Sequence, residues 1–268
     1  MIAALPTGLA TGLGALPIVL SRQLPRRAYD GVLGLGAGLM LAAATLGLLA
    51  EALASIRTPA GVSGSGLVLV VSGFLAGVIV AVAMDRFIPH GHARGHHAHI
   101  SHEQHGDHDH HHPGPPPGSN PRSRGLYLLL GAISIHRIPE GIAIGAGFAV
   151  SDSRLGWMLS AAVALQNVCE GMVMGAPLRQ AGLSPIRSLL LVSATGLMVP
   201  VGAVIGFALS GIATVALPFV LALAGGTLIY VTSNEIIPES HSHGHEGTAS
   251  AGLVVGFLLT MLLNVVLR

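Results

Sequence analysis

The sequence predicts an all-α protein that crosses a membrane several times. Of its 268 residues, 51% are hydrophobic and only 9% are charged, whereas a soluble globular domain carries about 25% charged residues. The hydrophobic residues gather in runs of about 20, the length that an α-helix needs to span a bilayer. Three of these runs contain related polar motifs. A soluble fold is therefore excluded, and the function is to be sought in the polar residues inside the spans.

Eight runs are long enough to be spanning helices. They cover about residues 1–20, 31–53, 65–88, 125–150, 156–178, 187–210, 214–234 and 248–267. Three helices precede a long polar loop, two carry the strongest motifs and three follow, so we expect a 3+2+3 arrangement. The chain then divides into residues 1–88 with helices one to three, a loop at 89–124, and residues 125–268 with helices four to eight and the functional site.

The arginines orient these helices, since the chain has no lysine. Nine arginines fall on one side of the expected membrane: Arg22, Arg26, Arg27, Arg86, Arg94, Arg122, Arg124, Arg179 and Arg187. Three fall on the other: Arg57, Arg154 and Arg268. Because positive loops stay in the cytoplasm, both termini are predicted to lie outside it, in a protein that crosses the membrane several times. The net charge of +1 gives no reason to expect nucleic acid as a partner.

An ionisable motif interrupts the fourth predicted helix. His136, Arg137 and Glu140 lie within five residues of an otherwise apolar run, and charged residues inside a membrane generally mark functional sites. His136 and Glu140 are four residues apart, so they share one helix face. Imidazole and carboxylate together are good ligands for Zn²⁺. Pro139 removes a backbone donor and is expected to break the helix where protein or a wet cavity covers it.

Related polar insertions occur in two later helices. Gln166 and Glu170 are four residues apart in the fifth, and Asn234, Glu235 and Glu239 end the seventh. Helix-to-helix hydrogen bonding would explain the amides, but two carboxylates buried together need a cation. We therefore expect an intramembrane site for a divalent transition metal, with Zn²⁺, Cd²⁺, Fe²⁺ and Mn²⁺ all compatible. The ligands expected from the residues alone are His136, Glu140, Gln166 and Glu170.

The loop between the third and fourth helices is rich in histidine. It holds 11 of the 15 histidines and lacks apolar residues to bury, so disorder is expected. Dense imidazoles bind Zn, Ni and Cu ions; the alternative is a soluble tether whose histidines do little. The candidate loop ligands are His96, His97, His99, His102, His105, His108, His110, His111 and His112. A smaller cluster, His241, His243, His245 and Glu246, follows the seventh helix.

The two central motifs resemble those of the ZIP (Zrt/Irt-like) family of metal-ion transporters. The resemblance is closest to the bacterial GufA-like branch of this family. They read His-x-x-Pro-Glu-Gly at 136–141 and Gln-Asn-x-x-Glu-Gly at 166–171. The resemblance extends over nearly the whole chain, through Gly12–Pro17, the glycine-rich helix with Met40 and the histidine-rich loop to Glu235–Glu239. It implies a multi-pass protein of a bacterial inner (plasma) membrane, with eight helices and both termini outside the cytoplasm. It also implies import of Zn, Fe, Mn or Cd, a mid-membrane site between helices four and five, and an elevator-like movement of a helix bundle.

The resemblance also assigns roles to individual residues. Besides the four ligands above, it implies Met40 as a further ligand, and Asn167 and Glu235 as members of an adjacent second site shared with the two motif glutamates. This chain departs from the family at three positions, with Arg137 in place of Asn, Cys169 in place of Pro and Asn234 in place of His. We expect Arg137, Cys169 and Glu239 to modulate the site. In particular, the permanent charge of Arg137 needs a buried anion, for which Glu140, Glu170 and Glu235 are the candidates, and we expect Arg137 to replace a second metal ion. Cys169 would straighten its helix or add a thiolate.

Three other functions compete with import. A metal exporter of the cation-diffusion type can also carry a histidine-rich loop. Proteins of that class have six helices followed by a soluble domain, whereas eight spans are expected here. An intramembrane zinc protease needs a His-Glu-x-x-His pair, which this sequence lacks. A metal-storing protein would explain the loop but not the buried carboxylates. We expect no enzymatic activity, the lipid bilayer and divalent metal ions as partners, and a homodimer as an open alternative to a monomer.

Overall fold

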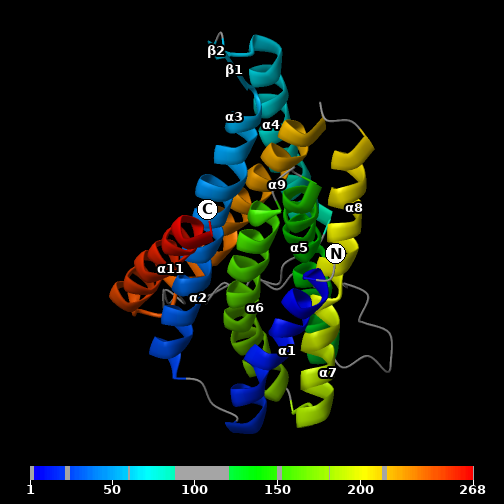
Figure 1. Ribbon diagram of the computed structural model, residues 1–268. Coiled ribbons are helices and arrows are strands. Elements are labelled where there is room, and N and C mark those ends of the chain that lie inside the picture. The colour runs from blue at the N-terminus through cyan, green and yellow to red at the C-terminus, as the bar shows by residue number, and fades with distance from the viewer. Residues whose placement is uncertain are drawn as a thin grey trace, which may run out of the picture.

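The computed structural model describes residues 3–21, 25–59, 61–87, 121–149, 153–180, 182–212 and 216–267. Its helices form one elongated bundle (Figure 1), which confirms the all-α prediction. The elements are α1 (Ala4–Ser21), α2 (Arg26–Ala42), η1 (Ala43–Leu49), α3 (Ala50–Ser55), β1 (Arg57–Thr58), β2 (Gly61–Val62), α4 (Gly64–Phe87), α5 (Pro121–Ala149), α6 (Arg154–Gln180), α7 (Pro185–Gly196), α8 (Met198–Ile212), α9 (Leu217–Val231), η3 (Thr232–Ile236), α10 (Ile237–Ser240) and α11 (Glu246–Leu267). The segments η1 and η3 are π-helical turns inside longer helices.

Within the described residues, six helical segments are long and apolar enough to cross a membrane. They are Arg26–Ser55, Gly64–Met84, Arg154–Gly175, Pro185–Ser210, Leu217–Ser240 and Glu246–Val266. Each corresponds to a predicted span, so the interpretation as a polytopic membrane protein is confirmed. The remaining two predicted spans correspond to α1 and α5, and the count of eight spans stays a prediction.

Three predicted helices have different boundaries in the structure. The run at 187–210 is two helices, α7 and α8, which meet at Leu197. The seventh predicted helix continues past residue 234 through η3 to Ser240, because a π-helical turn accommodates its polar insertion without ending the helix. The break expected at Pro139 is absent: α5 is one α-helix from Pro121 to Ala149, since a single missing donor removes only one hydrogen bond from a helix held by its neighbours on several sides.

Glycines allow four pairs of helices to pack closely. In each pair, a Cβ added to a glycine on one helix would collide with a backbone carbonyl oxygen of the other. The pairs are α1 with α6 through Gly171, α2 with α11 through Gly34, α4 with α9 through Gly77, and α5 with α8 through Gly141. Small residues at helix contacts are typical of membrane bundles, in which backbones approach closely.

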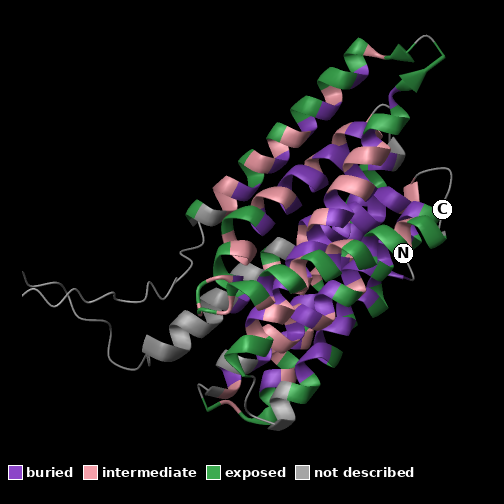
Figure 2. Ribbon diagram, turned by 90° about the vertical axis from the view of Figure 1, so that its left-hand side faces the viewer, coloured by how far each residue is buried: buried purple, intermediate pink, exposed green. Residues whose placement is uncertain are grey.

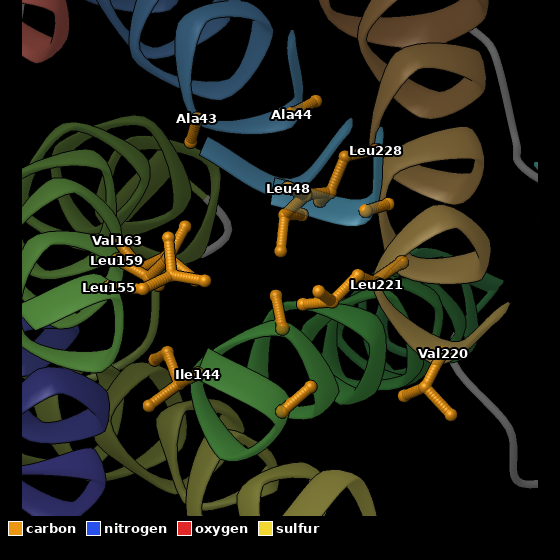
Figure 3. Close-up of a cluster of buried hydrophobic side chains, with 14 of the residues drawn as sticks. Ala43, Ala44, Leu48, Ile144, Leu155, Leu159, Val163, Val220, Leu221 and Leu228 are labelled. Carbon is orange, nitrogen blue, oxygen red and sulfur yellow. The ribbon is translucent and has the colours of Figure 1, made fainter. Parts of the chain in front are cut away.

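The helices differ in how far the rest of the protein covers them (Figure 2). In the most apolar 18-residue stretch of each span, 67% of the stretch is buried inside the protein for α2 and 61% for α6. The buried share is only 22% for α4 and also 22% for α11. The first two therefore lie centrally and the last two face outward. The largest cluster of buried hydrophobic residues among the described residues lies where η1, α5, α6 and α9 meet. Its members include Leu48 of η1, Ile144 of α5, Leu159 of α6 and Leu221 of α9 (Figure 3).

The arginine pattern agrees with the observed ends of the bundle. The β1–β2 hairpin, which contains Arg57, lies at one end, and the beginnings of α2 and α7, with Arg26, Arg27 and Arg187, lie at the other (Figure 1). Which end faces the cytoplasm stays a prediction. The histidine-rich loop and its nine candidate ligands lie outside the described residues, so the predicted disorder and metal binding of this segment stay predictions as well.

Candidate metal-transport site

Two adjacent helices bring the predicted carboxylates together. Nε2 of Gln166, on α6, donates to Oε1 of Glu140 on α5 at 2.8 Å and to Oε1 of Glu170 on α6 at 2.9 Å. Gln166 and Glu140 are almost fully buried, and the side chain of Glu170 is 18% exposed. The structure therefore brings these three predicted residues together, with the amide nitrogen of Gln166, and not its oxygen, facing the carboxylates. Their ligation of a metal ion stays a prediction.

The glycine that follows each glutamate positions its helix. A Cβ at Gly141 would collide with the carbonyl oxygen of Val199 on α8, and a Cβ at Gly171 would collide with that of Thr11 on α1. These contacts bring α8 and α1 against the turns that carry Glu140 and Glu170. The Glu-Gly pairs of the two motifs therefore combine a charged group with the close packing that buries it.

Arg137 lies in the same polar cluster and is fully buried. Its Nη1 donates to Oγ1 of Thr11 at 2.9 Å and to Oδ1 of Asn167 at 2.5 Å. Its Nη2 forms an ion pair with Oε2 of Glu170 at 2.7 Å and lies 3.8 Å from Sδ of Met174. The expectation that a buried carboxylate pairs with Arg137 is confirmed, and the carboxylate is that of Glu170.

Helix α1 completes the polar cluster with groups that the sequence analysis did not identify. The amide of Asn167 donates from Nδ2 to the carbonyl oxygen of Thr7 at 2.8 Å, while Thr11 accepts from Arg137. Both threonine hydroxyls also donate to carbonyl oxygens earlier in the chain, those of Ala3 and Gly8, and the hydroxyl of Thr7 lies 3.3 Å from the carbonyl oxygen of Ser160 on α6. Two threonines four residues apart in an apolar run were the available signal, but a threonine hydroxyl in a helix can bond within its own turn, so the sequence alone predicts no partner on another helix.

His136 and Cys169 lie on the same two helices. His136 belongs to α5, one turn before Glu140, and its side chain lies outside the described residues. Cys169 is buried, and its Cβ lies 3.8 Å from where a Cβ on Gly36 of α2 would stand. The thiol therefore belongs to the contact between α6 and α2, and α6 runs unbroken from Arg154 to Gln180, as expected for a helix without the family's proline.

The other predicted residues lie on η3, α10 and α2. Met40 is buried in α2, and its Sδ accepts a hydrogen bond from Oγ1 of Thr232 at 3.6 Å. Asn234 and Glu235 lie in the π-helical turn, and Glu239 is exposed on α10. Because π-helical turns often occur at functional sites, the turn is a structural sign of function that the sequence alone did not give. Ligation by Met40, Asn167 and Glu235 stays a prediction.

A second polar cluster joins the start of α2 to the turn before α11. The carboxylate of Asp30 is fully buried and accepts from Nδ1 of His243 at 2.9 Å and from Nδ1 of His245 at 3.2 Å. Tyr29 packs edge-on against the ring of His243, and His241 lies 3.1 Å from Oγ of Ser250. The predicted cluster of histidines after the seventh helix is therefore divided between different partners.

The chemistry of the main site favours a divalent cation. The carboxylates of Glu140, which is buried, and Glu170, which is partly buried, accept hydrogen bonds from one neutral amide. Oε2 of Glu140 is buried without a hydrogen bond to any side chain that the structure describes. Arg137 balances the charge of one of these carboxylates, so the cluster keeps one net negative charge that a further cation would stabilise. Among the described residues, no three His, Cys, Asp or Glu side chains already form a metal site; the predicted set includes His136, whose side chain is outside them.

Comparison with known proteins decides the family. The family profile described as ZIP Zinc transporter matches residues 1–264. The chain belongs to the ZIP zinc transporter family. Zinc transporter ZIPB of Bordetella bronchiseptica is 38% identical over 96% of this chain and 78% of its own length. Zinc transporter GufA of Myxococcus xanthus is 34% identical over 98% of this chain and 97% of its own length. Zinc transporter ZIP11 of Bos taurus is 29% identical over 95% and 93% of the two chains.

Membership of the ZIP family fixes the class of function. This ZIP chain is a membrane-embedded transporter of metal ions and not an enzyme, so the protease interpretation and the storage interpretation are excluded. The predicted resemblance to the GufA-like branch is confirmed by the similarity to GufA itself.

Proposed function

We propose that this ZIP chain imports Zn²⁺ into the cytoplasm through a site between α5 and α6. The observation that carries the proposal is the buried arrangement in which Glu140 and Glu170 share the amide of Gln166. Two carboxylates this close to one neutral amide repel each other, and a divalent ion between them relieves that repulsion. The names of ZIPB and GufA as zinc transporters favour zinc as the cargo.

Loading of the ion requires a change at Gln166. Its amide nitrogen now lies between Oε1 of Glu140 and Oε1 of Glu170, and an NH₂ group cannot ligate a cation. Rotation of the amide by half a turn about its terminal bond presents the oxygen, which is a ligand. Gln166 then offers oxygen to the same ion as the two carboxylates, and His136, one turn before Glu140, supplies a nitrogen. Such a set of one nitrogen and several oxygens suits Zn²⁺ and also Cd²⁺, Fe²⁺ and Mn²⁺.

Two groups of helices are suited to move past each other during transport. Side-chain hydrogen bonds join α1, α5 and α6 through Arg137, Asn167 and Gln166. Others join α4 to α9 and α2 to α11, through Thr227 and Thr260. The first group carries the site. Aliphatic side chains line the contact between the first group of helices and the second, among them those labelled in Figure 3. Aliphatic contacts have no directional bonds that a sliding movement must break. An elevator-like movement of the first group is therefore part of the proposal.

The polar ends of the bundle would serve the two sides of the membrane. The end at which α2 and α7 begin carries Arg26, Arg27 and Arg187, so we assign it to the cytoplasm and place both termini outside. The protein would lie in the bacterial plasma membrane as a multi-pass protein. The histidine-rich segment between α4 and α5 would then receive ions on the cytoplasmic side. A homodimer stays an open alternative to a monomer.

The proposal is tested with proteoliposomes that contain a fluorescent zinc chelator. External Zn²⁺ should produce a signal that depends on the protein, and Cd²⁺, Fe²⁺ and Mn²⁺ should compete to different degrees. Sidedness is checked by comparing vesicles before and after a membrane-impermeant reagent has blocked one orientation of the protein. Proteoliposomes that carry one of the competing ions but no zinc would contradict the choice of cargo. Flux in the outward direction alone would contradict import.

A further inference from the structure

The cluster beside the proposed zinc site already contains a cation. Arg137 is a permanent positive charge, because guanidinium does not lose its proton in proteins, and it is fully buried between α1, α5 and α6. It is also the largest fully buried side chain in the part of the chain that the structure describes. Burying a charge of this kind is costly unless it is paired and hydrogen-bonded, so its partners indicate what it does.

The partners of Arg137 are groups that could bind a metal ion. Its two terminal nitrogens contact an amide oxygen of Asn167, a carboxylate oxygen of Glu170, the hydroxyl of Thr11 and the thioether of Met174. Three oxygens and a sulfur around one positive group resemble the coordination shell of a cation. Because the guanidinium lies within this shell, a free ion could enter only if the arginine left.

Glu170 separates this shell from the proposed zinc position. Its Oε2 is 2.7 Å from Nη2 of Arg137, and its Oε1 is 2.9 Å from Nε2 of Gln166. The carboxylate therefore bridges two positions. One holds the guanidinium, and the other lies between Glu140 and Glu170, where the amide of Gln166 now donates. The second position is the one that an imported ion would take.

The charges favour one ion over two. Arg137, Glu140 and Glu170 together carry one negative charge, so one divalent ion leaves the cluster at one positive charge and two ions leave it at three. If Glu235 of η3 is counted as well, one ion gives neutrality and two give two positive charges. Excess charge of this size in the interior of a membrane protein is strongly unfavourable.

From these contacts we infer that Arg137 is a built-in substitute for a second metal ion, so this transporter carries a single divalent ion in its membrane core. The inference rests on the proposed function and deepens it by fixing how many ions the site holds. Arg137 thereby acts on the ion through Glu170, as a positioning residue and not as a ligand. Its replacement by a neutral side chain would free the shell of Asn167, Glu170, Thr11 and Met174 for a second ion.

The test counts ions in the membrane core of the full-length protein. Crystals are grown with Cd²⁺, whose anomalous scattering locates each bound ion and separates core ions from those held by loop histidines. The unmodified protein should show one Cd²⁺ between α5 and α6. Arg137→Asn should show a second, beside Asn167 and Glu170. Arg137→Lys keeps the charge and should show one, as should the control Arg187→Asn, which removes an exposed arginine at the start of α7.

Each outcome has a defined meaning. Two ions in the core of the unmodified protein would overturn the inference while leaving the proposed function intact. A folded Arg137→Asn protein with one ion would also overturn it, since it would mean that Arg137 only pins three helices together. If Arg137→Asn does not fold, Arg137→Gln is the second neutral variant, and the count in the unmodified protein still decides. The absence of any core ion in the unmodified protein would instead contradict the proposed site.

Discussion

The closest helix contact near the site, between α1 and α6, gives a quantitative prediction. In Gly171→Ala, the new Cβ would collide with the carbonyl oxygen of Thr11 and would lie 2.9 Å from the carbonyl carbon of Thr11 and 3.0 Å from the backbone nitrogen of Ala15. All of these atoms belong to the backbone of α1 and cannot rotate away. The two helices would have to separate by roughly 1 Å to restore ordinary contact distances.

The cost of this separation can be worked out from two contributions. Overpacking in a close contact destabilises by about 1–3 kcal/mol. Movement of α1 also stretches the bonds from Arg137 to Thr11 and from Asn167 to the carbonyl of Thr7, each worth about 0.5–1.5 kcal/mol. We expect Gly171→Ala to lower the free energy of unfolding by roughly 2–6 kcal/mol when the two contributions are combined.

The assay is equilibrium unfolding in mixed micelles with increasing SDS, read by circular dichroism. The matched control is Gly131→Ala in α5, where an added Cβ meets nothing within 4 Å and where alanine favours the helix by up to about 1 kcal/mol. Gly171→Ala should unfold at clearly lower SDS than the control and should transport zinc more slowly. A Gly171→Ala protein as stable as Gly131→Ala would refute the close approach of α1 and α6.

Two further predictions concern the ends of the bundle. Deletion of about residues 91–118 should preserve zinc transport but change its dependence on zinc concentration, because a histidine-rich loop can gather ions without forming the pathway; complete loss of transport in a correctly inserted deletion protein would contradict this. Asp30→Ala removes the acceptor of His243 and His245 and should destabilise by about 1–3 kcal/mol, with faster hydrogen exchange in the turn at 241–245. The exposed Ser242→Ala is the control, and equal exchange in the two variants would show that Asp30 does not hold the turn.

Hydrophobicity and residue spacing predicted most of the fold. The lengths of the apolar runs gave the helices, because a span must satisfy its own backbone inside lipid and has few alternatives to an α-helix. The i to i+4 spacing of Gln166 and Glu170 predicted one shared face, which the structure has. The spacing could not show that the run at 187–210 divides at Leu197, or that η3 carries the polar insertion through to α10, since both depend on neighbouring helices.

The partners of the polar residues were harder to predict than their positions. The permanent charge of Arg137 required a buried anion, and the sequence limited the choice to a few glutamates; only the packing of α5 on α6 selects Glu170. Asp30 gave no comparable signal, because a carboxylate at the end of an apolar run can usually reach water. Its partners, His243 and His245, are more than 200 residues away in the chain, and nothing in their spacing connects them to it.

Zinc flux through a protein with one altered carboxylate tests the proposed pathway most directly. Glu140→Gln keeps the size of the side chain but removes a charge that the ion requires, and it is compared with Glu51→Gln, in which the carboxylate is partly exposed and lies in the first turn of α3. Both proteins are reconstituted at equal density with an internal zinc chelator, together with His136→Ala and Glu170→Gln. We predict zinc uptake at the unmodified rate for Glu51→Gln and no uptake for the other three. Uptake by Glu140→Gln at the unmodified rate would contradict a pathway between α5 and α6.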